Sequence, residues 1–488
     1  MSDGITVRGG AGGVTAQIEE LEALAAALGA AAHALATAVA DRASAGTALV
    51  AAPALTVLDG PAGLVACERE ARALGAGLRG VAVTYQEADT DVTVRLRAVA
   101  SGMGHAWGEL GPVSVPLVGL LGLQAASTLV WLRLSRWTPT PWGGALLWVG
   151  HPAVAGRSDP LGAIGRLLAG PGLLPRPPVL GRGSVETLTV GMSSYLHALL
   201  PGRQPVLRDP VPAGAGLLAG LAAAAAGPGR LVVTAGPHAV PAHVPHTEAD
   251  VLSLVADQYA AAAADGLARV AVQRLEHADG SRSWVVAVPG TETWATGGAN
   301  PLDALTDLEL TAGVRDDVTA LVTRAMDQAG VSPGEPVLLA GHSLGGMAVA
   351  RIAADPVLAR RYTVAGVLTA GSPVAGYDVP ARTQVLQLEH AQDIVPGLRG
   401  LPDPDRVNRT TVVRDLGASA DATERVIRAP GAAHALDRYR RTAELLPAAD
   451  PSVQGFRRAT ARVLGRDVVA ARTWTFTGVR VPAQGCRP

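Results

Sequence analysis

The sequence contains no lysine, so all 41 residues counted as Lys or Arg are arginines. A Walker-type phosphate loop and Schiff-base catalysis both need the lysine amine itself, and the chain can form neither. Cysteine is also scarce, because Cys67 and Cys486 are the only two. Two cysteines are too few for a disulfide framework or a structural zinc site. Chemistry in this chain therefore rests on hydroxyl, imidazole, carboxylate or thiol groups.

An excess of charge of either sign is missing too, since the formal net charge is −1. No strong electrostatic field directs the chain toward nucleic acid, and we expect no nucleic-acid partner. The first residues, MSDGITVRGGAGG, lack a basic region followed by an apolar core. We therefore expect no ordinary secretory signal peptide.

Residues 1–100 show two long stretches of helical periodicity, at 14–39 and 64–92. Apolar residues recur in each at alternating spacings of three and four, as in a coiled-coil seam. The segment between the stretches contains the Pro and Gly residues that stop helices. This pattern predicts an antiparallel helical hairpin, with Cys67 buried in its seam as a small apolar side chain.

The second helical stretch contains Tyr85, followed four residues later by Asp89. A helical hairpin with this Y-x-x-x-D motif resembles the WXG-type substrates of type VII secretion in actinobacteria, although no Trp-x-Gly occupies the turn. The resemblance implies a helical-hairpin secretion partner and a secreted or cell-envelope location reached without a signal peptide. Otherwise Tyr85 packs in the helix, Asp89 is solvated, and the protein is cytoplasmic.

Residues 101–225 form a Pro/Gly-rich apolar connecting region, which we expect to be helical. Residues 113–134 are nearly long and apolar enough for a membrane span. Pro116 interrupts this stretch, and no basic loop pattern orients it. We expect a buried or interfacial helix there, and association with a membrane surface remains an alternative.

From residue 226 to 488 the pattern alternates between strands and helices. A β-hairpin is predicted around Asp279 and Gly280, and a helix over 314–330 that ends at a glycine. Apolar strands that alternate with helices predict an α/β fold with a mostly parallel sheet covered on both faces.

The segment GHSLGG places Ser343 between Gly341 and Gly345. With 58 glycines in 488 residues, a G-x-S-x-G pattern can arise by chance, so its surroundings decide its meaning. A buried strand is predicted before the serine and a helix after it, as the nucleophile elbow requires. Such a turn projects the Ser343 hydroxyl above the sheet edge and points the Leu344 N–H at a developing oxyanion.

A serine nucleophile needs a histidine base and a carboxylate behind it, in the chain order serine, acid, histidine for this type of elbow. Asp393 follows a late predicted strand, and His434 follows Asp393 along the chain. His390 shares its predicted loop with Asp393 and is better interpreted as a polar loop residue. The alternative acids are Glu389, Asp403 and Asp405.

Five motifs in order resemble the class 3 lipases: VVAVPGTET, DALTDL, GHSLGG, TAGSPVAG and DIVPGL. The resemblance covers about residues 284–439 and implies an α/β-hydrolase domain over 226–488. It implies Ser343 as nucleophile, Asp393 as acid and His434 as base, with oxyanion donors at Thr291 and Leu344. The sequence departs from the family at Pro289, Ala304 and Val374, which weakens inference about substrate and lid.

The resemblance implies a serine esterase or lipase that hydrolyses carboxylic esters of lipids or small alcohols, with no cofactor and no metal. An acyltransferase that uses the same acyl-enzyme is one alternative. A secreted effector with an inactive hydrolase domain is another. The three histidines His238, His243 and His246 are irregularly spaced across prolines, and we interpret them as a solvated loop.

Overall fold

The computed structural model describes residues 4–10, 25–34, 36–37, 67–77, 98, 100–102, 105, 182–198, 206, 209–239, 244–427, 430–465 and 467–482. By its internal contacts the chain divides into two compact units. One unit consists of Met1–Ala11 with Arg97–Pro488, and the other is Gly12–Leu96. The first residues of the chain therefore group with the large unit, although the predicted boundary placed them in the helical hairpin.

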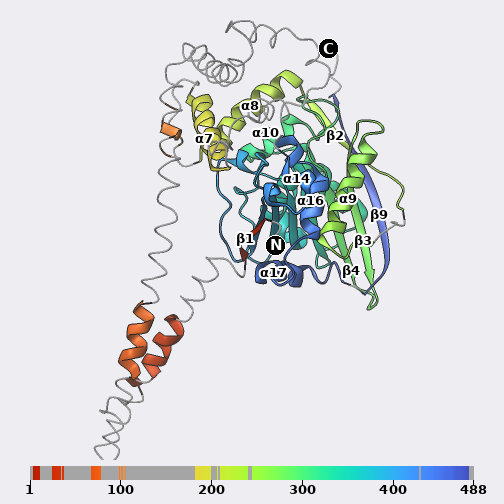
Figure 1. Cartoon of the computed structure of the whole chain (residues 1–488). Helices are drawn as coiled ribbons and strands as arrows, with labels where there is room; N and C mark the ends of the chain where they lie inside the picture. The colour runs from red at the N-terminus through yellow and green to blue at the C-terminus, as the bar shows by residue number, and fades with distance from the viewer. Residues whose placement is uncertain are drawn as a thin grey trace, which may run out of the picture. The chain divides into compact units, whose positions relative to one another are not determined.

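The large unit is built on a nine-stranded sheet with the order β1-β8-β7-β6-β5-β4-β3-β9-β2. Figure 1 shows β3, β4, β9 and β2 toward one side of this unit and β1 toward the other. The strands are β1 (Ile5–Gly9), β2 (Gly229–Ala235), β3 (Ala268–His277), β4 (Arg282–Val288), β5 (Pro336–His342), β6 (Thr363–Ala370), β7 (Gln384–His390), β8 (Arg409–Arg414) and β9 (Val468–Pro482). Strands β4 to β8 are parallel, and the strands outside them pair antiparallel.

The prediction of an α/β fold is confirmed, but the sheet as a whole is mixed. A tight turn joins β3 to β4, which forces these two strands to run antiparallel, and β9 then pairs antiparallel with β3. The helices of the large unit are α7 (Arg182–Ala198), α8 (Val211–Ala226), α9 (Glu248–Ala262), α10 (Ala304–Ala312), α11 (Asp317–Ala329), α12 (Leu344–Ala354), α13 (Leu358–Arg361), α14 (Ala422–Arg425), α15 (Pro430–Ala433), α16 (Leu436–Glu444) and α17 (Pro451–Thr460). Two short 3₁₀ helices, η6 (Pro396–Arg399) and η7 (Leu416–Ala418), lie among them.

Both faces of the sheet are buried under helices at its central strands. Along β4, Trp284, Val286 and Val288 belong to one core with side chains from α11 and α12. The alternate residues Val285 and Ala287 belong to a second core with α9, α16 and α17. Successive side chains of a strand point to opposite faces, so a strand apolar at every position must be covered on both.

Local sequence signals decide where these elements end. The predicted hairpin around Asp279 and Gly280 is confirmed, because Glu276 of β3 pairs with Arg282 of β4. The predicted helix over 314–330 is α11, which the Asp316 side chain caps by accepting a hydrogen bond from the Thr319 N–H. This helix ends at a glycine in the left-handed conformation, as predicted.

The smaller unit is described only in part. Residues 25–34 and 67–77 are helical, and a β-carbon on Gly75 would lie 3.1 Å from the carbonyl oxygen of Ala25. Cys67 is exposed, so the prediction that it is buried in a seam is wrong. Tyr85 and Asp89, and the apolar stretch at 113–134, lie outside the described residues.

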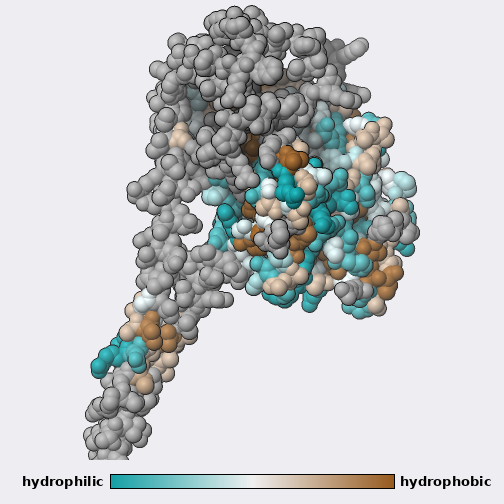
Figure 2. Space-filling model, in the orientation of Figure 1, coloured by the Kyte–Doolittle hydropathy of each residue, from teal (hydrophilic) through white to brown (hydrophobic). Residues whose placement is uncertain are grey.

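The surface of the large unit mixes polar and apolar residues. On the face drawn in Figure 2, hydrophilic and hydrophobic residues alternate in small patches. Within the described residues no helix is long and apolar enough to cross a membrane.

Candidate active site

Ser343 occupies a sharp turn between β5 and α12. Its φ of 53° and ψ of −123° make it the one non-glycine residue with positive φ in the described chain. A side chain raises the energy of this backbone conformation, and such strain gathers at functional sites. The strand-to-helix context predicted from the sequence is present, with β5 ending at His342 and α12 beginning at Leu344.

The two glycines around Ser343 are required by the close approach of other backbone atoms. A β-carbon on Gly341 would lie 2.3 Å from the carbonyl carbon of Gly345. A β-carbon on Gly345 would lie 2.2 Å from the carbonyl oxygen of Val288, at the end of β4. The Ser343 N–H donates to the carbonyl oxygen of Ala370, at the end of β6, over 2.9 Å. Neighbouring strands therefore lock the elbow at the carboxyl edge of the sheet.

Asp393 and His434 form a hydrogen-bonded pair at the same edge. Asp393 follows β7, His434 follows α15, and His434 Nδ1 lies 2.7 Å from Asp393 Oδ2. The same carboxylate oxygen accepts a hydrogen bond of 2.6 Å from the Tyr439 hydroxyl. The Val395 N–H donates to the other oxygen over 2.9 Å. These contacts fix the orientation of the carboxylate, as an acid behind a histidine base requires.

The electrostatics of this pair favour an ionised acid. Burial alone would raise the pKa of Asp393, but the charge of His434 and the hydrogen bonds from His434, Tyr439 and Val395 outweigh it and hold the pKa below its ordinary value. Since a carboxylate only accepts, His434 carries its proton on Nδ1 and leaves Nε2 free to take another.

His434 lies beside the elbow, because its ring centroid is 4.6 Å from that of His342. A β-carbon on Gly371, the residue after β6, would lie 3.0 Å from both Asp393 Oδ2 and His434 Cε1. The structure thus places Ser343, Asp393 and His434 at one edge of the sheet. No hydrogen bond from the Ser343 hydroxyl occurs among the described residues, and such contacts often shorten only when substrate binds.

The candidate oxyanion donors are Thr291, in the loop between β4 and α10, and Leu344, at the start of α12. We call this loop, residues 289–303, the oxyanion loop. A β-carbon on Gly290 would lie 2.6 Å from the β-carbon of Ser343, so this loop packs directly on Ser343. Within the described chain, neither the Thr291 N–H nor the Leu344 N–H donates to a protein acceptor. Leu344 is the first residue of α12, where a helix has no internal acceptor for its N–H groups. Both donors are therefore free to bind a negative oxygen.

Asp307 of α10 holds this loop through Thr291, and the sequence analysis did not predict this role. The Thr291 hydroxyl donates to Asp307 Oδ2 over 2.8 Å. Burial raises the pKa of Asp307 to about 7, although the hydrogen bond from Thr291 opposes the rise. Asp307 is the second aspartate of the DALTDL motif, which was the one sign of its role in the sequence. Its contact with Thr291 is seen only in the folded structure.

The other end of the loop is anchored by Asp303. Its carboxylate accepts hydrogen bonds from the Gly297 N–H over 2.8 Å and the Thr306 N–H over 3.0 Å. Arg480 of β9 donates to it over 2.7 Å. The oxyanion loop is thus tied to α10 and to β9, which limits how far Thr291 can move.

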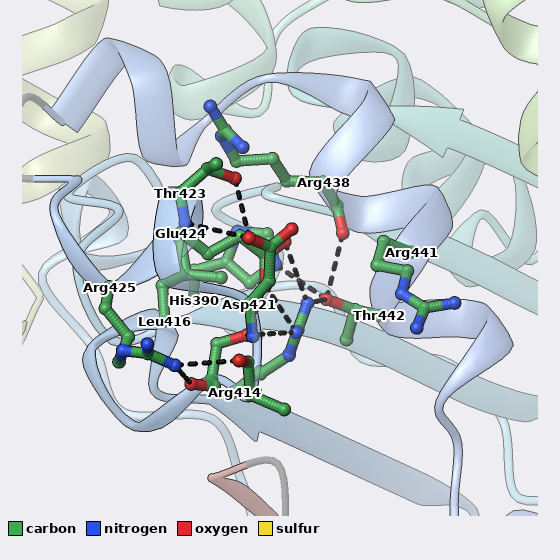
Figure 3. A network of polar contacts seen from close by, with 12 residues as sticks. His390, Arg414, Leu416, Asp421, Thr423, Glu424, Arg425, Arg438, Arg441 and Thr442 are labelled. Atoms are coloured by element: carbon green, nitrogen blue, oxygen red, sulfur yellow. Dashed lines mark hydrogen bonds and ion pairs between the residues drawn. The ribbon is translucent and has the colours of Figure 1, made fainter.

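A buried network of polar contacts includes Arg414, Glu424 and His390 (Figure 3), and it reaches the residue before His434 through the Ala433 carbonyl oxygen. Arg414, the last residue of β8, donates to Glu424 over 2.6 Å, and Figure 3 shows the guanidinium directed at this carboxylate. His390 lies in the same network, with Nδ1 2.7 Å from the Ala433 carbonyl oxygen and Nε2 2.8 Å from Thr442 Oγ1. His390 is the buried last residue of β7, so its interpretation as a polar loop residue is wrong. Both of its ring nitrogens are occupied inside the protein, which leaves neither to act as base.

Helix α8 packs on the oxyanion loop, and the segment before α8 contacts η6. Arg399 of η6 makes a two-pronged contact with Asp209, the residue two before α8, at 2.8 and 2.7 Å. A β-carbon on Gly297 of the oxyanion loop would lie 2.1 Å from the β-carbon of Ala226, at the end of α8. Helix α8 contains only Val, Pro, Ala, Gly and Leu over its 16 residues. An apolar helix therefore adjoins the oxyanion loop.

The remaining predictions concern metal ligands and alternative acids. Among the described residues, no group of three or more His, Cys, Asp or Glu side chains could hold a metal ion. His243 lies outside the described residues, and His238 packs against Trp474 with ring centroids 5.8 Å apart. Asp403 accepts a hydrogen bond from Gln387 over 2.8 Å, whereas Asp393 is the acid that contacts His434.

Comparison of the chain with protein families, with curated proteins and with solved structures finds no match.

Proposed function

We propose that the large unit is an α/β-hydrolase, similar to the class 3 lipases, that hydrolyses carboxylic esters through Ser343, His434 and Asp393. The observation that carries the proposal is the strained Ser343 elbow beside the 2.7 Å hydrogen bond between His434 and the buried Asp393. Strain at a serine has a chemical use when a base and a free pair of N–H donors lie next to it. All three features meet at one edge of this sheet.

In the proposed reaction the Ser343 oxygen attacks the ester carbonyl carbon, and His434 Nε2 takes the hydroxyl proton. The Asp393 carboxylate stabilises the imidazolium that forms. The carbonyl oxygen becomes negative and accepts hydrogen bonds from the Thr291 and Leu344 N–H groups. His434 then protonates the departing alcohol oxygen. Water attacks the acyl-enzyme by the same route, which releases the acid and restores Ser343.

A fluorophosphonate probe tests the nucleophile. We expect the probe to label Ser343 in the folded full-length protein, to label nothing in Ser343→Ala, and to react far more slowly with His434→Ala. His246→Ala is the matched control, because this histidine is exposed and contacts Asp250 through its backbone N–H. Labelling that persists in Ser343→Ala, or folded wild type that does not react, would overturn the proposal.

We propose further that the ester substrate is apolar, as in a lipid. The apolar helix α8 next to the oxyanion loop supports this, since Leu221 is 62 % exposed on it. We expect Leu221→Arg to lower kcat/KM several-fold for long-chain esters and to leave short-chain esters unchanged. Val357→Arg is the control, because Val357 is 64 % exposed at the start of α13. Equal rates across acyl lengths would contradict the proposed substrate class.

We also propose that residues 12–96 form the WXG-like hairpin and direct export of the chain. The two helical stretches at 25–34 and 67–77, with Gly75 against Ala25, support this. We expect the protein in the culture medium of a host with type VII secretion, and Tyr85→Ala with Asp89→Ala to retain it in the cell. Retention of the wild type would contradict export and leave the enzymatic proposal unaffected.

A further inference from the structure

Tyr259 of α9 makes two polar contacts that reach both sides of the elbow. Its hydroxyl accepts a hydrogen bond of 2.5 Å from the Gly290 N–H, the residue before Thr291. The same hydroxyl lies 2.8 Å from Nδ1 of His342, the residue before Ser343. A β-carbon on Gly290 would lie 2.7 Å from this hydroxyl, so the loop, the tyrosine and the elbow are in close contact.

The direction of each hydrogen bond follows from the donors and acceptors. His342 Nε2 lies 2.9 Å from the carbonyl oxygen of His434, which only accepts, so Nε2 carries the proton. Burial lowers the pKa of His342 to about 3, with the charge of His434 as a smaller cause, so the ring is neutral and Nδ1 is bare. The Tyr259 hydroxyl therefore donates to Nδ1 while its oxygen accepts from Gly290. One uncharged chain of hydrogen bonds runs from the oxyanion loop to the turn that carries the base.

The turn that carries the base is held at two successive carbonyl groups. The Ala433 oxygen accepts from His390 Nδ1 over 2.7 Å, and the His434 oxygen accepts from His342 Nε2 over 2.9 Å. Both imidazoles are buried, and burial lowers the pKa of His390 to about 4. The ring of Tyr439, whose hydroxyl holds Asp393, stacks on His390 with centroids 3.9 Å apart. The contact through His342 also reaches the oxyanion loop, by way of the Tyr259 hydroxyl.

We propose that Tyr259 and His342 are positioning residues that keep the oxyanion loop at Gly290 and the base turn at His434 in fixed register around Ser343. This inference rests on the proposed hydrolysis. Thr291 and His434 must act on the same tetrahedral intermediate, and a displacement of either by about 1 Å costs on the order of a hundredfold in rate. The Tyr259–His342 bridge joins the two elements that hold these groups.

Tyr259→Phe removes both hydrogen bonds and keeps the ring. We expect kcat with a soluble ester to fall about 10- to 100-fold with KM nearly unchanged, because the bridge positions reacting groups and does not contact the substrate. Tyr362→Phe is the matched control, since its hydroxyl also lies inside the protein, 2.6 Å from Asp327. An unchanged kcat in Tyr259→Phe, or an equal fall in Tyr362→Phe, would overturn the inference.

Two substitutions at His342 separate positioning from packing. His342→Gln keeps an N–H donor for the His434 carbonyl, whereas His342→Leu keeps only volume. We expect His342→Gln to retain at least tenfold more kcat than His342→Leu, and equal loss in both would refute a positioning role.

Nitrogen NMR of histidine-labelled full-length protein gives a readout that does not depend on turnover. We expect His342 to be neutral with its proton on Nε2, and the His434 Nδ1–H signal to shift in Tyr259→Phe. A charged ring or an Nδ1 proton on His342 overturns the bridge even if the enzyme is active. If the protein neither hydrolyses esters nor reacts with the probe, but gives the expected NMR signals, the proposed function is refuted and the bridge is not.

Discussion

The strain at Ser343 predicts that removing its side chain entirely will make the protein more stable. At φ 53° and ψ −123° the residue is close to the mirror image of an extended conformation, which only glycine adopts readily. A residue held in such a region costs about 1–3 kcal/mol, and glycine adds about 0.5–1 kcal/mol of entropy in the unfolded chain. We therefore expect Ser343→Gly to raise the free energy of unfolding by about 1 kcal/mol.

Ser343→Ala separates backbone strain from the loss of the hydroxyl. Alanine keeps the β-carbon and the strain, so its stability should stay within about 0.5 kcal/mol of the wild type. For a domain of this size the Ser343→Gly gain corresponds to about 2 °C in Tm. Calorimetry of the full-length wild type and both variants measures the difference.

The refuting result is a Ser343→Gly protein that is no more stable than Ser343→Ala. In that case the positive φ would carry no energetic penalty, and the elbow would lose its physical interpretation as a strained turn. Both variants should fail to react with the fluorophosphonate probe. Ser343→Gly is therefore expected to lose reactivity and gain stability, whereas Ser343→Ala loses reactivity with little change in stability.

Three further predictions concern the acid, the oxyanion loop and the buried ion pair. Asp393→Asn should lower kcat/KM about 10⁴-fold without unfolding the protein, because an amide cannot stabilise the imidazolium; steady-state kinetics and circular dichroism would show this. The pKa of Asp307 is raised to about 7, so its contribution to stability is complete below about pH 4 and is lost as the pH rises through 7. Asp307→Asn should remove a slope of about 1.4 kcal/mol per pH unit from the urea-unfolding free energy over that interval, and an unchanged slope would contradict the assignment. Glu424→Gln leaves the Arg414 charge buried and should destabilise by about 3–5 kcal/mol, whereas Glu444→Gln, in an exposed pair, should cost below about 1 kcal/mol; equal losses would contradict the buried network.

Local patterns predicted those features that depend on residues close in sequence. The turn at Asp279–Gly280 needs only the turn residues and the strands beside them, and it joins β3 and β4 as expected. The strand before Ser343 and the helix after it could be predicted because hydrophobic periodicity and the glycines at the ends of elements are local properties of the sequence. The positive φ of Ser343 occurs within this predicted context.

Features that depend on contacts between residues far apart in the chain could not be predicted from the sequence. Strand β1 pairs with β8 at the sheet edge, although more than half of the chain separates them, and no local pattern specifies such a partner. Thr291 and Asp307 are 16 residues apart, and Tyr259 and His342 are 83 apart. The sequence analysis predicted a loop position for His390, because a single histidine near the end of a strand contributes no periodic pattern.

By itself the sequence determined the α/β class, the elbow around Ser343 and the chain order of the candidate acid and base, because each follows from local periodicity or from residue order. Only the tertiary structure decided that Asp393 contacts His434, that His390 is buried elsewhere, and that Tyr259 and His342 join the oxyanion loop to the base turn. These contacts form between side chains brought together by the parallel strands, whose carboxyl ends meet at one edge. The geometry of the candidate site therefore depends on several segments that meet at this edge, and no single segment of the chain specifies that geometry.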